Sequence, residues 1–279
     1  PFGDTCKYGY DNTGRLVEQV NVIGDSIITK SVFTLNAAGE KEHERIVGPV
    51  PHHLKNTSYA YTYEPNDELT SDSVTSYTND GAGNRLSGDN SYTFTVDNLL
   101  KSIGSTTYTY DALGNRVTRS NNGTYTRYVL DLQTGLSQVL QERDTNGIVS
   151  ASYIYGLDLI ARIDSNNNIQ YYHFDAQHNT VALSDDSGMV TDTYVYEPFG
   201  LLIEHIGNTE QPYTFLGQYG IQQEDSIIYY IRARYYDAAN QRFISKDVYH
   251  ATFTDPHTLN RYVYGLNNPV SVFDVTGLY

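Results

Sequence analysis

Aromatic and β-branched residues recur at every second position in short runs along most of the chain. The clearest runs are Tyr-x-Tyr segments, such as Tyr8 with Tyr10 and Tyr108 with Tyr110. Successive side chains of a strand point to opposite faces, so both rings of such a pair lie on the same face. The alternation therefore predicts short β-strands with one buried face.

A turn signal of fixed spacing follows these runs. Asp is followed three positions later by Gly, and then often by Arg and an aliphatic residue. The Asp side chain accepts hydrogen bonds from the backbone N–H groups just after it, and Gly adopts a positive φ that other residues resist. The clearest copies, at 8–16, 77–86 and 108–117, have the turn pairs Asp11 and Gly14, Asp80 and Gly83, and Asp111 and Gly114.

Weaker copies of the unit lie at 33–41, 142–149, 162–169, 194–200 and 235–243. In two of them Asn167 and Asn240 occupy the glycine position, and Asn tolerates a positive φ better than most residues. Arg85 and Arg116 begin the strands that follow their turns, where each is expected to lie over a tyrosine ring. Each copy thus predicts one β-hairpin, and the repetition sets the architecture.

The predicted fold class is all-β. Apolar positions with a period of 3.6 are absent over any long window, and turn-forming residues recur too often for long helices. A single hairpin cannot bury its face, but hairpins in series can form one long curling antiparallel sheet, as a spiral shell or part of a barrel. No low-complexity linker divides the chain, which favours one continuous sheet.

Composition supports a β-rich protein with a tyrosine-lined sheet. The chain has 279 residues, of which 27 are Tyr and none is Trp. Tyrosine buries its ring while its hydroxyl group still needs a partner, which suits the half-solvated face of a sheet. The length is enough for one large β domain or two smaller ones.

The net charge, the single cysteine, the short apolar runs and the placement of the histidines argue against nucleic-acid binding, a disulfide, a membrane span and a metal site. The formal net charge is −15, and an acidic chain repels the phosphate backbone, so nucleic-acid binding is disfavoured. Cys6 has no second cysteine for a disulfide, and no apolar run is long enough to span a membrane. His52 and His53 point to opposite faces of a strand, so no metal site is expected, and no cofactor either. The start at Pro1, without a leader, predicts a piece of a longer polypeptide.

The last fifth of the chain contains four ordered blocks: YYIRARYYD at 229–237, RFISKD at 242–247, NRYVYGLNNP at 260–269 and DVTGL at 274–278. Together they resemble the Rhs-associated core that closes bacterial Rhs/YD-repeat proteins, the C subunits of ABC (Tc) insecticidal toxins and polymorphic toxins. The upstream hairpin unit resembles the YD repeat, which teneurin-type proteins share. The resemblance implies two domains: a YD/Rhs repeat sheet at 1–212 and an Rhs-associated core, or end plug, at 213–279.

This resemblance also implies a self-cleavage site. In the family, the motif P-x4-D-P-x-G-L marks a cut directly after Leu, and the second acid lies in the R-F-x-S-x-D block. The matching acids are Asp247 and Asp274, the neighbouring cations Arg242 or Arg261, and the cleavage-motif residues Pro269, Gly277, Leu278 and Tyr279. Such an aspartyl-protease-like pair shares one proton and activates water for a single turnover.

Three departures from the family pattern affect this site. Val248 and Val275 replace the prolines after the two acids, and Gln241 stands where Gly usually precedes Arg-Phe. Proline would fix the backbone beside each acid, so its loss loosens the catalytic geometry. Asp274 and Gly277 also have the spacing of the repeat turns, so Asp274 is equally interpreted as the turn residue of a last hairpin. Both interpretations stay open.

The resemblance implies a structural function. The chain is expected to form shell wall and end plug of an Rhs-type secreted toxin or surface protein that encapsulates or presents a cargo segment beyond Tyr279. Its partners would be that cargo and the remaining YD-repeat shell, with bacterial export to the outside or the cell surface. Self-cleavage near Leu278 is the one enzymatic activity expected. The alternative is a surface adhesion module that recognises glycans or a protein.

Overall fold

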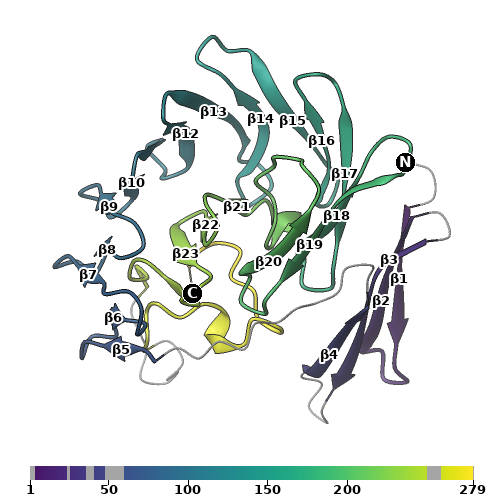
Figure 1. The fold of residues 1–279 in the computed structure, drawn as a ribbon, viewed down its shortest axis with the longest axis horizontal. Helices are drawn as coiled ribbons and strands as arrows, with labels where there is room; N and C mark the ends of the chain where they lie inside the picture. The colour runs from purple at the N-terminus through teal and green to yellow at the C-terminus, as the bar shows by residue number, and fades with distance from the viewer. Residues whose placement is uncertain (1–3, 24–25, 36–40, 48–59, 250–258, 279) are drawn as a thin grey trace. The chain divides into compact units, whose positions relative to one another are not determined.

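The computed structural model describes residues 4–23, 26–35, 41–47, 60–249 and 259–278. Nearly all of the regular structure in these ranges is antiparallel β (Figure 1). The exceptions are two short 3-10 helices, η1 (Gly217–Tyr219) and η3 (Gly265–Asn267). The predicted all-β class is therefore confirmed.

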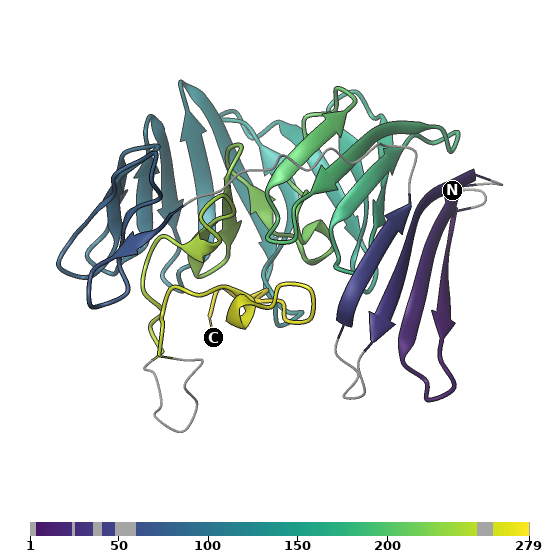
Figure 2. The ribbon, with the colours of Figure 1, turned by 60° about the horizontal axis from the view of Figure 1, so that its bottom comes forward.

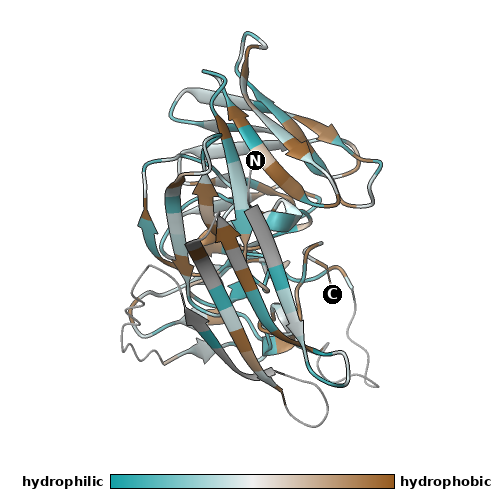
Figure 3. Ribbon diagram, turned by 90° about the vertical axis from the view of Figure 1, so that its right-hand side faces the viewer, coloured by the Kyte–Doolittle hydropathy of each residue, from teal (hydrophilic) through white to brown (hydrophobic). Residues whose placement is uncertain are grey.

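The largest sheet has twelve strands, and each strand pairs with its neighbours in the sequence. This order is the result expected from tandem hairpins. The strands are β9 (Tyr92–Phe94), β10 (Leu100–Ile103), β11 (Thr106–Tyr110), β12 (Arg116–Asn121), β13 (Thr124–Asp131), β14 (Gln138–Arg143), β15 (Val149–Tyr155), β16 (Leu159–Asp164), β17 (Ile169–Phe174), β18 (Thr180–Ser184), β19 (Val190–Tyr196) and β20 (Leu202–Ile206). Brown and teal residues alternate along many of the strands in Figure 3, as the period of two requires.

The remaining described strands form smaller sheets. A four-stranded sheet, whose strands lie side by side in Figure 2, contains β1 (Asp4–Tyr10), β2 (Leu16–Ile23), β3 (Ser26–Leu35) and β4 (Lys41–Val47). Two hairpins pair β5 (Thr62–Tyr63) with β6 (Leu69–Ser71) and β7 (Thr78–Asn79) with β8 (Arg85–Ser87). A second four-stranded sheet contains β21 (Gln222–Gln223), β22 (Ile228–Ile231), β23 (Arg234–Asp237) and β24 (Arg242–Phe243). Single bridges, Ser71 to Ser76 and Ser87 to Ser91, continue the hairpin series from β5 to β9.

The repeat turns have the predicted geometry. In the turn after β11, Oδ1 of Asp111 accepts hydrogen bonds from the backbone nitrogens of Leu113 and Asn115, both at 2.9 Å. Gly114 donates its N–H to the Asp111 carbonyl oxygen at 3.1 Å and has a φ of 83°. The turns that begin at Asp11 and Asp80 contain the same bonds. The Asp side chain therefore accepts the hydrogen bonds that the backbone N–H groups of the turn would otherwise donate to water.

The prediction that asparagine adopts a positive φ in the place of the repeat glycine is confirmed at Asn167 and wrong at Asn240. Asn167 has a φ of 65°, but the positive φ near Asn240 belongs to Gln241, at 60°. The reason is a shift in the bonding of this turn. Asn240 donates its backbone N–H to Oδ1 of Asp237 at 3.0 Å and its side-chain Nδ2 to Oδ2 at 2.7 Å. The chain therefore reverses one residue later than in the other copies.

Packing divides the chain into two compact units, each built from two separate stretches. The first unit comprises residues 1–54 and 153–226. Its buried side chains include Leu183 and Tyr213, and Tyr213 meets the ring of Tyr153 edge-on at 4.8 Å. The predicted division at residue 213 follows sequence motifs and stays a prediction.

The second unit comprises residues 55–152 and 227–279. Figure 1 shows its hairpins, from β5 to β14, arranged around β22 and β23. Tyr92, Leu100, Ile103 and Tyr108 of the hairpins form one core cluster with Ile228, Tyr230, Tyr235 and Ile244 of the C-terminal segment. This burial of apolar and ring surface holds the C-terminal segment within the unit.

The predicted arginine–tyrosine contacts are confirmed in this second unit. The guanidinium carbon of Arg85 lies 4.5 Å from the centre of the Tyr77 ring, and that of Arg116 lies 5.3 Å from the Tyr108 ring. Arg116 also lies 4.0 Å from the ring of Tyr230. Arg85 thus contacts a ring of its own hairpin, whereas Arg116 joins its hairpin to the C-terminal core through cation–π contacts.

Candidate functional site

The candidate site lies on the buried hairpin of β22 and β23. All residues of both strands are buried, and Arg234 is the first residue of β23. Arg234 is 5% exposed, and its guanidinium carbon lies 3.6 Å from the centre of the Phe243 ring. A buried guanidinium needs anionic partners and hydrogen-bond acceptors, because the charge has lost its water.

Both predicted acids are partners of this one guanidinium. Nη2 of Arg234 lies 2.7 Å from Oδ2 of Asp247 and 3.4 Å from Oδ2 of Asp274. The side chains of the two acids are 4% and 12% exposed. Residues 27 positions apart in the sequence are thus brought to the same nitrogen atom, away from bulk water.

Burial controls the protonation of this cluster. It raises the pKa of Asp274, and the charge of Arg234 with the hydrogen bonds of Thr276 and Gly277 offsets that rise only in part. Burial also lowers the pKa of Arg234 to about 10, although the charges of Asp247 and Asp274 raise it. Arg234 is therefore a cation at neutral pH, and Asp274 holds its proton more firmly than an ordinary aspartate.

Hydrogen bonds to its backbone carbonyl groups dock the C-terminal tail on the turn between β22 and β23. Ala233 donates its N–H to the carbonyl oxygen of Thr276 at 3.1 Å. Nε of Arg234 donates to the carbonyl oxygen of Gly277 at 2.5 Å, and the guanidinium of Arg232 donates to that of Val275. Figure 1 shows the yellow tail ending beside β23. Three successive carbonyl groups before Leu278 are therefore fixed.

Asp274 also has the geometry of a repeat turn. Its Oδ1 accepts backbone N–H groups from Thr276 at 3.1 Å, Gly277 at 2.8 Å and Leu278 at 3.2 Å. The two interpretations of Asp274 are compatible, because Oδ1 forms the turn while Oδ2 faces Arg234. Turn formation thus places this carboxylate close to the predicted cleavage position.

Gly277 is the point of closest approach between the tail and the core. It has a φ of 72°, and a Cβ added there would lie 2.0 Å from the Ile231 carbonyl oxygen and 2.9 Å from the Arg234 nitrogen. Backbone atoms cannot move aside as a flexible side chain can. The glycine of the cleavage motif is therefore required by space as well as by conformation.

The two predicted cations occupy other positions. The Arg261 guanidinium donates to the backbone carbonyl oxygen of Asp247, and the Arg261 carbonyl oxygen accepts Nη1 of Arg234 at 2.9 Å. Arg242 lies over the ring of Tyr63 at 4.6 Å. Arg234, the cation that contacts both acids, was missed. Its signal was an arginine directly before the aromatic pair Tyr235 and Tyr236.

Hydrogen bonds hold the backbone beside each acid where the family has proline. Oδ1 of Asp247 accepts the backbone N–H of Tyr249 at 2.8 Å, across Val248. The Val275 carbonyl oxygen accepts a hydrogen bond from Arg232.

Of the other residues named from the sequence, Pro269 is buried. Tyr279, the histidines His52 and His53, and the turn of the copy at 33–41 lie outside the described residues.

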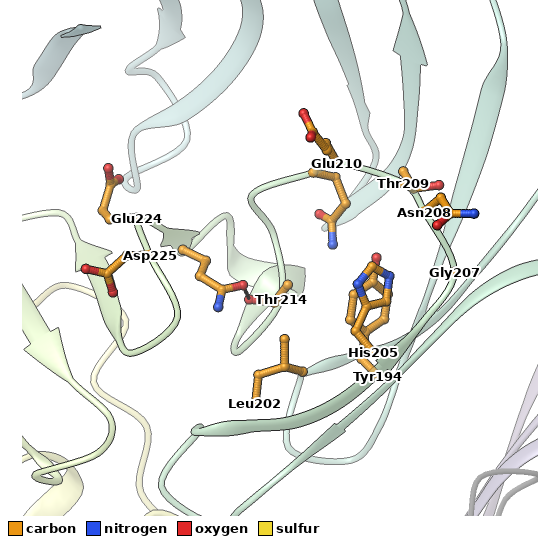
Figure 4. A pocket seen from close by; sticks show the side chains of 12 residues that line it. Tyr194, Leu202, His205, Gly207, Asn208, Thr209, Glu210, Thr214, Glu224 and Asp225 are labelled. Carbon is orange, nitrogen blue, oxygen red and sulfur yellow. Dashed lines mark hydrogen bonds between the residues drawn. The ribbon is translucent and has the colours of Figure 1, made fainter. Parts of the chain in front are cut away.

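A separate pocket of about 460 Å³ lies in the first unit. Figure 4 shows the rings of Tyr194 and His205 stacked in it, with Glu224 and Asp225 across the pocket. The ring centres are 4.4 Å apart, and Nε2 of His205 lies 2.9 Å from Oδ1 of the buried Asp192.

No group of three or more potential metal ligands occurs in the described ranges. The helical turns of those ranges are also too short and polar to cross a bilayer.

The fold and the C-terminal site define a class of protein: tandem Asp-x-x-Gly hairpins closed by a C-terminal core that holds two carboxylates on a buried arginine. Residues 3–270 match the family model described as teneurin YD-shell. The chain belongs to the teneurin YD-shell family. The resemblance inferred from the sequence motifs is thereby confirmed.

Related sequences and structures agree with this assignment. The tRNA3(Ser)-specific nuclease WapA of Bacillus spizizenii and the tRNA(Glu)-specific nuclease WapA of Bacillus subtilis subsp. natto are each 33% identical over 144 residues. The match covers 50% of this chain and 6% of each relative. The crystal structure of TcdB2-TccC3-Cdc42 superposes with a TM-score of 0.66 at 14% identity, over 98% of this chain and 18% of that one.

The Tc holotoxin pore of Photorhabdus luminescens gives a similar result, with a TM-score of 0.65 at 15% identity. It also covers 98% of this chain and 18% of the other. These structures share the fold of the present chain. The chain spans only a small part of the relatives it matches.

Proposed function

We propose that this chain is a wall and end-plug region of an Rhs-type toxin, which holds a cargo segment that follows residue 279. Two observations support the proposal. The C-terminal segment packs into the hairpins of the second unit through a shared core. The matched relatives are nucleases by name, and the match covers only 6% of their length.

We further infer that this region cuts its own chain between Leu278 and Tyr279. The observation that carries this inference is the contact of Asp247 and Asp274 with the same nitrogen of Arg234. One acid that is ionised and one that is protonated form the pair that a water-activating aspartyl mechanism needs. The raised pKa of Asp274 suits it to the protonated role, and the docked carbonyl groups hold the chain in place.

The test is a version of the chain extended past Tyr279 by a reporter domain. On a denaturing gel, the parent should separate into two fragments, while Asp247→Asn and Asp274→Asn should remain whole. Asn keeps the size of the side chain and removes its acid function. Asp111→Asn, in a repeat turn, serves as the matched control and should be cut. An uncut parent, or equal cutting of all variants, would exclude the self-cleavage.

A second candidate function is recognition of a surface glycan. The stacked rings of Tyr194 and His205 favour it, because ring faces pack against the apolar faces of sugars. Glu224 and Asp225, across the pocket, can accept hydrogen bonds from sugar hydroxyl groups. The test is a glycan array with the parent chain and His205→Ala. Binding that the substitution abolishes would support this function, and an array without any signal would oppose it.

A further inference from the structure

The hydroxyl group of Thr276 lies between an acid of the site and the carbonyl group of the proposed cleavage position. Oγ1 of Thr276 is 3.1 Å from Oδ1 of Asp274 and 3.0 Å from the carbonyl oxygen of Leu278. Its own backbone is fixed, because the Thr276 carbonyl oxygen accepts the N–H of Ala233 at 3.1 Å. The hydroxyl is thus held beside the carbonyl group that water would attack.

The hydroxyl has one proton for two acceptors. Oγ1 already accepts the backbone N–H of Leu278 at 3.1 Å. When Asp274 is ionised, its oxygen competes for the hydroxyl proton. When Asp274 carries a proton on Oδ2, Oδ1 is a weaker acceptor, and the hydroxyl proton can point to the Leu278 oxygen. Burial raises the pKa of Asp274 and so favours the second arrangement.

The turn itself does not need this hydroxyl group. The equivalent positions of two other turns are occupied by Ala82 and Leu113, which have none. In all of these turns the backbone N–H groups supply the bonds to the aspartate. Thr13 and Ser187 carry a hydroxyl at this position that binds the aspartate of their own turn. The Thr276 hydroxyl adds to such a bond a contact with the Leu278 carbonyl oxygen, and the proposal rests on that contact.

We propose that the Thr276 hydroxyl donates a hydrogen bond to the carbonyl oxygen of Leu278 and stabilises the negative charge that forms there. This role rests on the proposed self-cleavage. Water attacks the Leu278 carbonyl carbon, a C–O bond forms, and the π electrons move to the oxygen that Thr276 contacts. The ionised acid takes a proton from water, and the protonated acid gives its proton to the Tyr279 nitrogen. The C–N bond then breaks, leaving a free amine on Tyr279 and a Leu278 carboxylic acid, which releases its proton to water and becomes a carboxylate.

The experiment compares cleavage rates in the chain extended past Tyr279. Thr276→Val keeps the shape and removes the hydroxyl, and it should slow cleavage about 100-fold, the usual loss for one donor to a developing oxyanion. Thr276→Ser should restore the rate to within a few-fold. Thr13→Val removes the corresponding hydroxyl of another turn, whose Oγ1 lies 2.7 Å from Oδ1 of Asp11, and should leave the rate unchanged.

Each other outcome contradicts a defined part of the account. Cleavage of Thr276→Val at the parental rate would overturn the role of Thr276 and leave the self-cleavage intact. Equal slowing by Val and Ser, together with equally lowered melting temperatures, would assign Thr276 a purely structural role and overturn the proposal. An uncut parent chain would overturn the self-cleavage itself, and the role of Thr276 with it.

Discussion

Gly277 and Gly114 have similar positive φ angles in very different surroundings. Their φ values are 72° and 83°, but a Cβ at Gly114 would meet no atom within 4 Å, whereas one at Gly277 would overlap the Ile231 carbonyl oxygen. Both substitutions to Ala carry the conformational cost of the left-handed region, about 1–2 kcal/mol. The steric overlap adds to this cost at Gly277 only.

The expected result is that Gly277→Ala detaches the tail while Gly114→Ala does not. Limited proteolysis should cut the last residues of Gly277→Ala much faster than those of the parent, and urea unfolding should measure the cost at Gly114. Equal protection of the tail in both variants would show that Gly277 is not the contact that the structure describes.

Gln241 is a residue whose backbone conformation suits glycine. It is exposed and has a φ of 60°. Gln241→Gly should therefore raise the free energy of unfolding by up to about 1 kcal/mol, since it removes left-handed strain at little cost in contacts. Asn167→Gly, at a φ of 65°, is the control and should gain less, because Asn tolerates this region. Urea titration measures the free energy of unfolding of both variants. An equal or larger gain for Asn167→Gly would show that left-handed strain at Gln241 does not explain the effect.

The protonation of Asp274 predicts the pH dependence of the proposed self-cleavage. Since burial raises its pKa, Asp274 keeps its proton to a higher pH than an ordinary aspartate. Cleavage should therefore continue above the usual aspartate range and fall as pH rises through the shifted pKa. Gel assays of the extended chain over a pH series measure this limb. A rate that increases steadily with pH would contradict the assignment of Asp274 as the proton donor.

Single residues were predictable from sequence where a local pattern fixed them. The turn pairs follow from spacing, since an Asp side chain reaches only the amides just after it. Arg234 was not predictable as the shared partner of two acids, because that contact depends on how the tail returns to β23. The shift from Asn240 to Gln241 likewise depends on two hydrogen bonds from Asn240 to Asp237 that the spacing does not reveal.

At the level of elements, a buried ion pair joins a repeat hairpin to the core. Nη1 of Arg85, at the start of β8, lies 2.5 Å from Oδ2 of Asp237, at the end of β23, and the two side chains are 3% and 0% exposed. Asp237 also receives the two hydrogen bonds of Asn240. Loss of the arginine would leave a buried carboxylate without its cation.

Arg85→Leu should therefore lower the free energy of unfolding by about 3–5 kcal/mol. Arg15→Leu removes the same type of contact at a partly exposed pair, Arg15 with Asp11, and should have little effect. Chemical denaturation measures both, and the double variant Arg85→Leu with Asp237→Leu should recover part of the loss. Equal effects at Arg85 and Arg15 would show that burial does not control the strength of the pair.

The strands themselves were predictable because the period of two and the turn spacing act over a few residues. The arrangement of the C-terminal core was less predictable from the sequence. Arg85 to Asp237, and Tyr77 to Asn240 at 2.9 Å, are contacts between segments about 150 residues apart. Nothing in the local pattern indicates which repeat meets which part of the core. The compact units likewise combine stretches that are distant in the sequence.

At the scale of the whole molecule, the described residues form a hairpin series whose C-terminal segment packs against earlier hairpins of the second unit. The family was predictable from four blocks in the last fifth of the chain, because these blocks build the hairpin, the acids and the docked tail. The cargo was not, because it would lie beyond the residues that form this fold.

Intact-mass spectrometry of the chain extended past Tyr279 tests the central claim most directly. The account predicts two products that appear together, one ending at Leu278 and one beginning at Tyr279, with masses that add up to the parent plus one water. Asp274→Asn should show only the uncut mass. A stable parent mass, or a cut at another bond, would contradict the account.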